Sequence, residues 1–275
     1  MKTLTYFSAH ASLNSKPILA AFLEGARKHY TLVENDMTAD VAVIWSCLWA
    51  GRMEPNKEIY EHFRSQNKPV IIIEVGALKR NITWKISVNN ITTEGHHGHL
   101  DNLSDDRLKL FGYELWSEGM RNRNNGKILI AGQHHKSHQL HHLVSQEDWI
   151  QRQVKIIQDQ TDRAIVVRSH PRSPLSMYSE QPHKIANTYD DFNFDANYYC
   201  VVNYSSGPGI QAAIQGTPVI TSAYSLAYPV SNRIDRLKKL KNRATRQWLT
   251  EMVHTEYFIE EIQDGMWYTR LESAL

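Results

Sequence analysis

The stretch that most constrains this chain is residues 198–220, YYCVVNYSSGPGIQAAIQGTPVI. An apolar, β-prone run at 199–202 precedes two serines, Ser205 and Ser206, in a glycine-rich segment, and a second apolar run follows. Pro208 suits a first helical position, where its missing N–H costs nothing. The pattern predicts a buried strand, a tight turn, a short helix and another buried strand. Because helix N-termini bind anions, the turn predicts a phosphate site.

Apolar runs alternate with amphipathic helical stretches along the chain. The run at 41–45 is continuously apolar, which is typical of a parallel strand buried on both faces. Helical periodicity at 16–30 and 55–66 flanks it, and the alternation predicts an α/β fold with parallel sheets. The segment 79–116 is irregular and polar, so no regular structure is predicted there. A basic helix is predicted over 231–252.

The sequence RNRNNGK (121–127) is the best linker candidate. It predicts two Rossmann-like domains that face each other across a cleft. The first comprises residues 1–120. The second comprises residues 121–275, with its tail helix free to pack back on the first domain. In open α/β sheets, ligands bind beyond the carboxyl ends of the strands.

The composition excludes several classes of protein. The 275 residues are 41% hydrophobic, yet no apolar run approaches the length of a membrane span. The N-terminus lacks the apolar core of a signal peptide. Cys47 and Cys200 lie in apolar segments, which indicates buried thiols of a reducing compartment. We therefore expect a cytoplasmic protein without a membrane partner, and its oligomeric state stays open.

Basic side chains follow the predicted strand at 164–167. The run Arg168-Ser169-His170-Pro171-Arg172 supplies guanidinium forks and an imidazole, which suit phosphate oxygens. If this strand neighbours the strand at 199–202, both loops reach one sheet edge. The alternative is a loop histidine with two exposed arginines. The predicted donor-binding residues are Arg168, His170, Arg172, Ser205, Ser206, Gly207 and Gly209.

Glu74 ends the apolar strand predicted at 70–73, in the first half of the chain. A carboxylate there can take a proton from an attacking hydroxyl, which makes Glu74 the candidate catalytic base. The alternative is a strand-end glutamate that caps a helix or meets Lys79 or Arg80.

Other motifs carry less weight. Gly207-x-Gly209-x-x-Ala212 matches a dinucleotide fingerprint, but the acidic residue expected about twenty positions later is missing. The histidines at 96–99 and 134–142 complete no recognisable zinc pattern, so no metal is expected, although one histidine can line the cleft. Trp45 offers a stacking surface for a sugar or base, but core packing is the commoner fate of such a residue.

These motifs give the chain a resemblance to two-Rossmann GT-B glycosyltransferases, in the group of capsule-polysaccharide transferases and phage relatives. Arg168–Pro171 resembles the group's HP motif, and the run 203–212 resembles its serine-pair motif. Pro69–Gly76 and the tail 246–267 are similar to its acceptor-side strand and closing helices. The resemblance implies that residues 1–120 are the acceptor-side domain and that residues 121–275 bind the nucleotide sugar. It also implies that His170 and the serine pair hold the donor phosphate, that Glu74 is the base, and that no metal or other cofactor is needed. The implied co-substrate is a nucleotide sugar, with UDP-sugar favoured. Several relatives carry an acidic pair before a glycine, where this chain has Glu74-Val75-Gly76.

The acceptor is predicted from charge and resemblance. A slightly basic enzyme of this group resembles phage enzymes that glycosylate hydroxymethylated bases, such as hydroxymethylcytosine, in the host cytoplasm. The acceptor would then be a base flipped out of double-stranded DNA. Two alternatives stay open: a capsule, polysaccharide or lipid-linked glycan acceptor, and a non-catalytic nucleotide- or nucleic-acid-binding protein. A solvated helix face plus a linker also explains the basic clusters. The predicted DNA-binding residues are Arg121, Arg123, Lys238, Lys239, Lys241 and Arg243.

Overall fold

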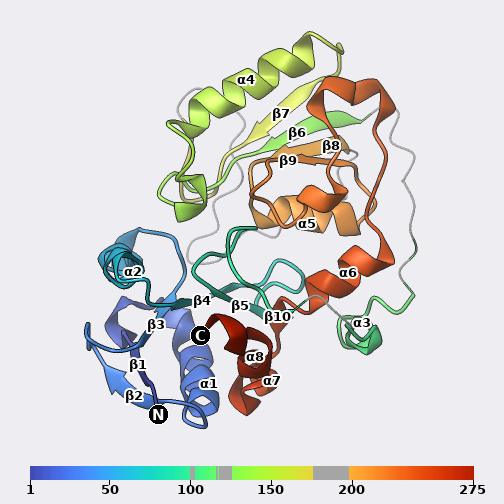
Figure 1. Ribbon diagram of the computed structural model, residues 1–275. Coiled ribbons are helices and arrows are strands. Elements are labelled where there is room, and N and C mark those ends of the chain that lie inside the picture. The colour runs from blue at the N-terminus through green and yellow to red at the C-terminus, as the bar shows by residue number, and fades with distance from the viewer. Residues whose placement is uncertain (100–102, 116, 118–125, 176–197) are drawn as a thin grey trace. The chain divides into compact units, whose positions relative to one another are not determined.

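A computed structural model describes residues 1–99, 103–115, 117, 126–175 and 198–275, and every structural statement below concerns these residues. The chain divides into two compact units, shown in Figure 1. The first unit consists of Met1–Glu114 and Thr250–Leu275, and the second is Leu115–Leu249. The boundary that the sequence analysis placed at 120/121 falls within 118–125, outside the described residues.

The first unit is built on a six-stranded sheet of order β10-β5-β4-β3-β1-β2. Strands β1 to β4 pair in parallel, as the apolar runs predict, while β5 and β10 are antiparallel additions at one edge. The prediction of an irregular segment at 79–116 is wrong, because it contains β5 and the helix α3 (Asp106–Leu110). The strands are β1 Thr3–Tyr6, β2 Thr31–Glu34, β3 Val41–Trp45, β4 Val70–Val75, β5 Trp84–Val88 and β10 Glu256–Tyr257.

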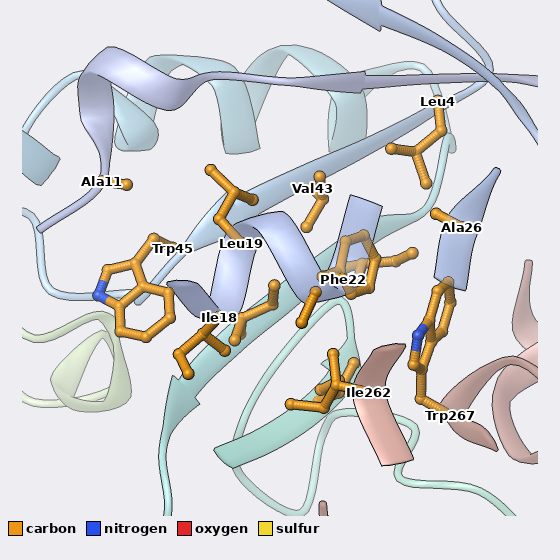
Figure 2. Packing of buried hydrophobic residues seen from close by; sticks show 14 of the residues in the cluster. Leu4, Ala11, Ile18, Leu19, Phe22, Ala26, Val43, Trp45, Ile262 and Trp267 are labelled. Atoms are coloured by element: carbon orange, nitrogen blue, oxygen red, sulfur yellow. The ribbon is translucent and has the colours of Figure 1, made fainter. Parts of the chain in front are cut away.

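Helices cover both faces of this sheet. On one face α1 (Lys16–Ala26) packs with the tail helices α7 (Ile259–Asp264) and α8 (Met266–Leu271), as Figure 2 shows. Phe22 and Trp267 stack there with ring centroids 4.4 Å apart. Trp45 belongs to the same core, so packing explains it and sugar stacking does not. The opposite face packs on α2 (Asn56–Ser65).

The second unit carries a four-stranded, wholly parallel sheet of order β7-β6-β8-β9. The helix α4 (Gln146–Gln158) packs on one face and begins where Ser145 Oγ accepts from Asp148 N. The helix α5 (Gly207–Ile214) follows β8 directly and packs against β8 and β9. The strands are β6 Lys127–Ala131, β7 Ile165–Arg168, β8 Tyr198–Asn203 and β9 Val219–Thr221. The predicted strand–turn–helix–strand of residues 198–220 is confirmed.

The prediction of one basic helix over 231–252 is wrong. The chain instead forms a short 3-10 helix, Ile234–Lys239, an irregular link, and then α6 (Arg246–Val253). The Asn232 amide bonds both the N–H and the C=O of Lys241, which holds the link as a loop. Leu237 and Leu240 enter the core of the second unit. These local bonds and buried leucines outweigh the helical propensity of the lysines.

Candidate functional site

The order of the second sheet reverses between β6 and β8. The chain leaves β6 for β7 on one side and then returns to β8 on the other. In open α/β sheets ligands bind outside the carboxyl ends of the strands at such a switch point. Ala131, the last residue of β6, is paired with Arg168 on one side and with Asn203 on the other. The predicted site residues of β7 and β8 therefore follow strand ends at one edge.

The turn after β8 is held by Asn203. Its buried Nδ2 donates to the Ser206 carbonyl (3.0 Å) and to Ser206 Oγ (2.8 Å). A Cβ on Gly209 would come within 2.4 Å of Asn203 Oδ1, so the turn needs glycine at this position. The Ser206 side chain does not cap α5. The turn thus presents the N-terminus of α5 without a side-chain cap, which suits an anion.

The loop after β6 lies beside this turn. Gln133 is 4% exposed, and its Oε1 accepts from Ser205 N at 3.3 Å. Its backbone N–H donates to Gln146 Oε1 (2.6 Å), while its Nε2 is buried with no hydrogen-bond partner among the described residues. An unpaired buried amide donor costs about 1–3 kcal/mol, and a bound anion would satisfy it. Gln133 was not among the predicted site residues, although a polar residue two positions after a buried strand is a signal of a binding site at the sheet edge.

Two histidines meet at the same edge. The rings of His134, after β6, and His170, after β7, make an edge contact with centroids 5.3 Å apart. His170 Nδ1 accepts from Arg172 N and His134 Nδ1 from Lys136 N, which leaves the Nε2 of each ring as the donor in the neutral form. Burial, followed by His135, Arg172 and Lys136, lowers the pKa of His134 to about 4. His134 is therefore a neutral hydrogen-bond donor at neutral pH.

The loops after β7 and β8 are not direct neighbours, which corrects the sequence prediction. Strand β6 separates β7 from β8. The loop after β6 lies between the loops after β7 and β8 and contacts both. Gln133 accepts a hydrogen bond from Ser205 N, and the ring of His134 contacts that of His170. Arg168 is half-buried at the end of β7, and Arg172 is exposed.

Glu74 lies at the carboxyl edge of the first sheet, near the end of β4. Its carboxylate accepts from Ser46 Oγ at 2.6 Å and from Val75 N at 3.0 Å. Ser46 follows directly on β3, the parallel neighbour of β4. The hydroxyl of Ser46, rather than Lys79 or Arg80, therefore holds this side chain, and Glu74 remains half-buried.

The predicted DNA-binding residues do not gather at this edge. Lys238 and Lys239 are exposed on the 3-10 helix, which is tied to the start of β8 because Tyr199 Oη donates to Leu237 O at 2.7 Å. That is the opposite end of the strands from the Ser205 turn. Arg243 Nη1 donates to the Ser231 carbonyl, and Lys241 is exposed. The remaining two, Arg121 and Arg123, lie outside the described residues.

A cavity of about 620 Å³ lies beside these lysines, at the strand-start end of the second unit. Its lining mixes Asp159 and Asp235 with Arg236, Lys238 and Lys239. This mixed charge lacks the uniformly positive surface that a nucleic-acid backbone requires.

Comparisons with known proteins place the fold. No protein-family model matches the chain, and no curated protein sequence matches it. Two solved structures that are similar come from Thermosulfurimonas dismutans KpsC. Its beta Kdo 2,7 transferase has a TM-score of 0.55 at 14% identity over 98% of this chain and 99% of that one. Its beta Kdo 2,4 transferase has a TM-score of 0.50 at 14% identity over 92% and 90%. The likeness confirms the α/β fold class across nearly the whole chain.

Among the described residues, no helix combines the length and the apolarity that a membrane span needs.

Proposed function

We propose that this chain is a glycosyltransferase that moves a sugar from a nucleotide-activated donor to a hydroxyl group of a saccharide acceptor. The observation that carries the proposal is the switch point of the second sheet. There the buried, unpaired Nε2 of Gln133 lies beside Ser205 at the uncapped start of α5. The full-length likeness to two Kdo transferases supports this reading.

The second unit is proposed to hold the donor phosphates. The backbone N–H groups at the start of α5 and Gln133 Nε2 donate to phosphate oxygens. Ser205 Oγ, which donates to Gln139 Oε1 at 3.2 Å in the structure, turns to the phosphate when the nucleotide sugar binds. His170 Nε2, Arg168 and Arg172 add donors from the β7 side of the edge. Together they stabilise the charge that collects on the nucleotide as it leaves, which is the usual way a protein lowers such a barrier.

Glu74 of the first unit is the proposed base. It takes the proton from the acceptor hydroxyl, whose oxygen attacks the anomeric carbon. The bond from that carbon to the phosphate oxygen breaks, and the nucleotide departs with the electron pair. The configuration inverts, and no metal or further cofactor takes part. The reaction requires both units to act on one donor–acceptor pair, so turnover is itself a test of that requirement.

The acceptor class is argued from the comparisons and from charge placement. The similar structures are named for transfer of Kdo, a sugar, which favours the saccharide alternative over DNA. DNA as acceptor has no support from the comparisons. Lys238 and Lys239 also lie at the strand-start end of the second unit, away from the Ser205 turn. DNA therefore serves as one arm of the test.

The test is mass spectrometry of acceptors after incubation with nucleotide sugars. The donors are uridine, cytidine and guanosine nucleotide sugars, including nucleotide-activated Kdo. The acceptors are Kdo-terminated oligosaccharides, hydroxymethylated duplex DNA and plain duplex DNA. A gain of one sugar on the oligosaccharide is the expected result. A gain on hydroxymethylated DNA would transfer the proposal to the DNA acceptor. Nucleotide binding without any turnover would favour the non-catalytic reading.

Donor binding is checked with matched variants on the second unit. Arg172→Ala is expected to weaken nucleotide-sugar binding in calorimetry about tenfold, the size expected for one charge-assisted contact. Arg152→Ala removes the same charge from the exposed surface of α4 and should leave binding unchanged. Equal affinities of the two variants would contradict the phosphate role of the β7 loop.

A further inference from the structure

Three charged residues form a row across the edge of the first sheet. Glu74 of β4 is paired with Lys85 of β5, and Lys85 is paired with Glu256 of β10. Directly opposite residues lie on the same face of a sheet. Lys85 is 7% exposed and Glu256 is 1% exposed, so a buried lysine is the middle member of a row of opposite charges.

The two carboxylates differ in what else holds them. Glu256 accepts from Ala77 N at 2.6 Å and from Thr83 Oγ1 at 2.7 Å, and Leu78 N also donates to it. A Cβ on Gly76 would come within 2.4 Å of Glu256 Oε2, so glycine admits the carboxylate to this turn. Glu256 is thus committed to the turn after β4. Glu74 accepts from Ser46 Oγ and Val75 N instead, and it remains the half-buried end of the row.

The residue that holds Glu74 from the other side has an unusual backbone. Ser46 has φ of +63°, a left-handed conformation that side-chain-bearing residues rarely adopt. Its Oγ donates to Glu74 and accepts from Leu48 N at 3.1 Å, which fixes the direction of the hydroxyl. Strained backbone of this kind concentrates at functional sites.

Three titratable groups around the row are neutral at neutral pH. Burial raises the pKa of the Cys47 thiol well above its usual range, and Glu74 adds to this. Burial, followed by Glu256, raises the pKa of Tyr113 to about 12. Burial lowers the pKa of His97 to about 4, with Lys85 contributing. Burial also lowers the pKa of Lys85, while Glu256 and Glu74 act in the opposite direction. Arg107 brings a further positive charge to the Glu256 end of the row, because its Nη2 donates to the Glu256 carbonyl at 2.8 Å.

We propose that Ser46 and Lys85 are positioning residues for Glu74: Ser46 orients the carboxylate through its hydrogen bond, and Lys85 provides a basic side chain directly opposite it on the same face of the sheet. This inference rests on the proposed role of Glu74 as base. If Lys85 had only a structural role, it would pair with Glu256 alone, and its titration would not depend on Glu74. The two possibilities differ in what they predict for the titration of Lys85 and for turnover.

The first experiment needs no activity. The titration of the Lys85 ammonium is followed by NMR of labelled lysine side chains in the wild type, Glu74→Gln and Glu58→Gln. Glu58 is an exposed glutamate on α2 and serves as the matched control. Glu74→Gln is expected to lower the pKa of Lys85, because it removes one of the two carboxylates that raise it. A titration that is the same in both variants would overturn the proposal.

The second experiment measures kcat and KM for Lys85→Met, Lys85→Arg and Ser46→Ala. Lys85→Met and Ser46→Ala are expected to reduce kcat at least tenfold with donor KM within twofold, and Lys85→Arg should restore part of the loss. A raised KM with unchanged kcat would overturn the proposal. A wild type without turnover on any donor, but with the expected Lys85 titration, would refute the proposed function and leave the Lys85–Glu74 coupling intact.

Discussion

Each unit has a polar site at the carboxyl ends of its parallel strands, but different groups hold the two sites in place. In the second unit the site is held by neutral amides: Asn203 fixes the serine turn, and Gln133 bonds Ser205. In the first unit Glu74 is held by Ser46 Oγ and Val75 N, and it ends a row of charged residues in which Lys85 is opposite both Glu74 and Glu256. The amides hold the turn without adding charge, and the proposed site takes its positive charge from Arg168, Arg172 and the start of α5. A buried ion row suits a site that must keep its own carboxylate in place.

The charged site should be the more fragile of the two, and Glu256 tests this most severely. Glu256→Ala removes the acceptor for Ala77 N and Leu78 N and leaves Lys85 with one carboxylate fewer. A buried donor left without a partner costs about 1–3 kcal/mol, so the loss of these acceptors should lower the unfolding midpoint in urea sharply. The matched control is Glu260→Ala, an exposed residue of α7, which should fall within about 0.5 kcal/mol of the wild type. Equal urea midpoints for Glu256→Ala and Glu260→Ala would contradict the expectation that the charged site is the more fragile of the two.

Glu74 separates the chemistry of the two sites. Glu74→Gln keeps the shape of the side chain but cannot accept a proton from the acceptor hydroxyl. Turnover should fall about 100-fold or more, the usual contribution of a general base. Nucleotide-sugar affinity, measured by calorimetry, should remain that of the wild type, because the proposed donor groups belong to the second unit. Retained turnover would remove Glu74 from the mechanism.

Gln133 tests whether the neutral site binds an anion. Gln133→Ala deletes the unpaired Nε2 donor and the acceptor for Ser205 N. The affinity for the nucleotide sugar should fall about tenfold, consistent with about 1.5 kcal/mol for a hydrogen bond to a charged group. The effect on stability should be smaller than that of Glu256→Ala, because Ser205 N is the only described donor to this amide. Unchanged affinity would show that the phosphates bind elsewhere.

The same contrast explains what the sequence could reveal. The serine turn and its helix are contiguous, so local turn chemistry and an apolar run were sufficient to predict β8, α5 and β9. The charged row depends on Glu256, which is 171 residues from Lys85 by residue number. No local sequence pattern predicts that a two-residue strand of the tail pairs with β5. For the same reason the sequence could place Glu74 at a strand end but could not find its partners, Ser46 and Lys85.

Local sequence patterns also could not predict the order of the strands in the second sheet. Parallel pairing of the second sheet follows from strand–helix alternation. That β6 lies between β7 and β8 is decided by tertiary packing, and it makes Gln133 and His134 the bridge between the predicted halves. The six-residue 3-10 helix at Ile234–Lys239 likewise reflects side-chain bonds of Asn232 and Gln160 that propensity does not encode.

Ser46 measures how much strain the charged site carries. Ser46→Gly relieves the left-handed backbone but removes the hydroxyl, whereas Ser46→Ala removes the hydroxyl and keeps the strain. Since such a conformation costs a residue with a Cβ about 1–2 kcal/mol, the glycine variant should unfold at the higher urea concentration. Both variants should lose turnover to a similar degree. A glycine variant no more stable than the alanine variant would show that the φ of +63° carries no cost.

The smallest effect concerns His134 and the pH dependence of the neutral site. The imidazole of an unfolded chain has a pKa of about 6.5, while that of His134 is lowered to about 4, mainly by burial. Between these values the unfolded state binds a proton that the folded state does not. The contribution to stability is therefore complete above about pH 6.5 and is lost as the pH falls towards 4. His134→Asn retains an acceptor for Lys136 N, so its stability should fall less than that of the wild type between pH 7 and pH 5. His142→Asn, on the exposed surface, is the control. Parallel pH profiles for all three proteins would mean that His134 is not held neutral at this edge.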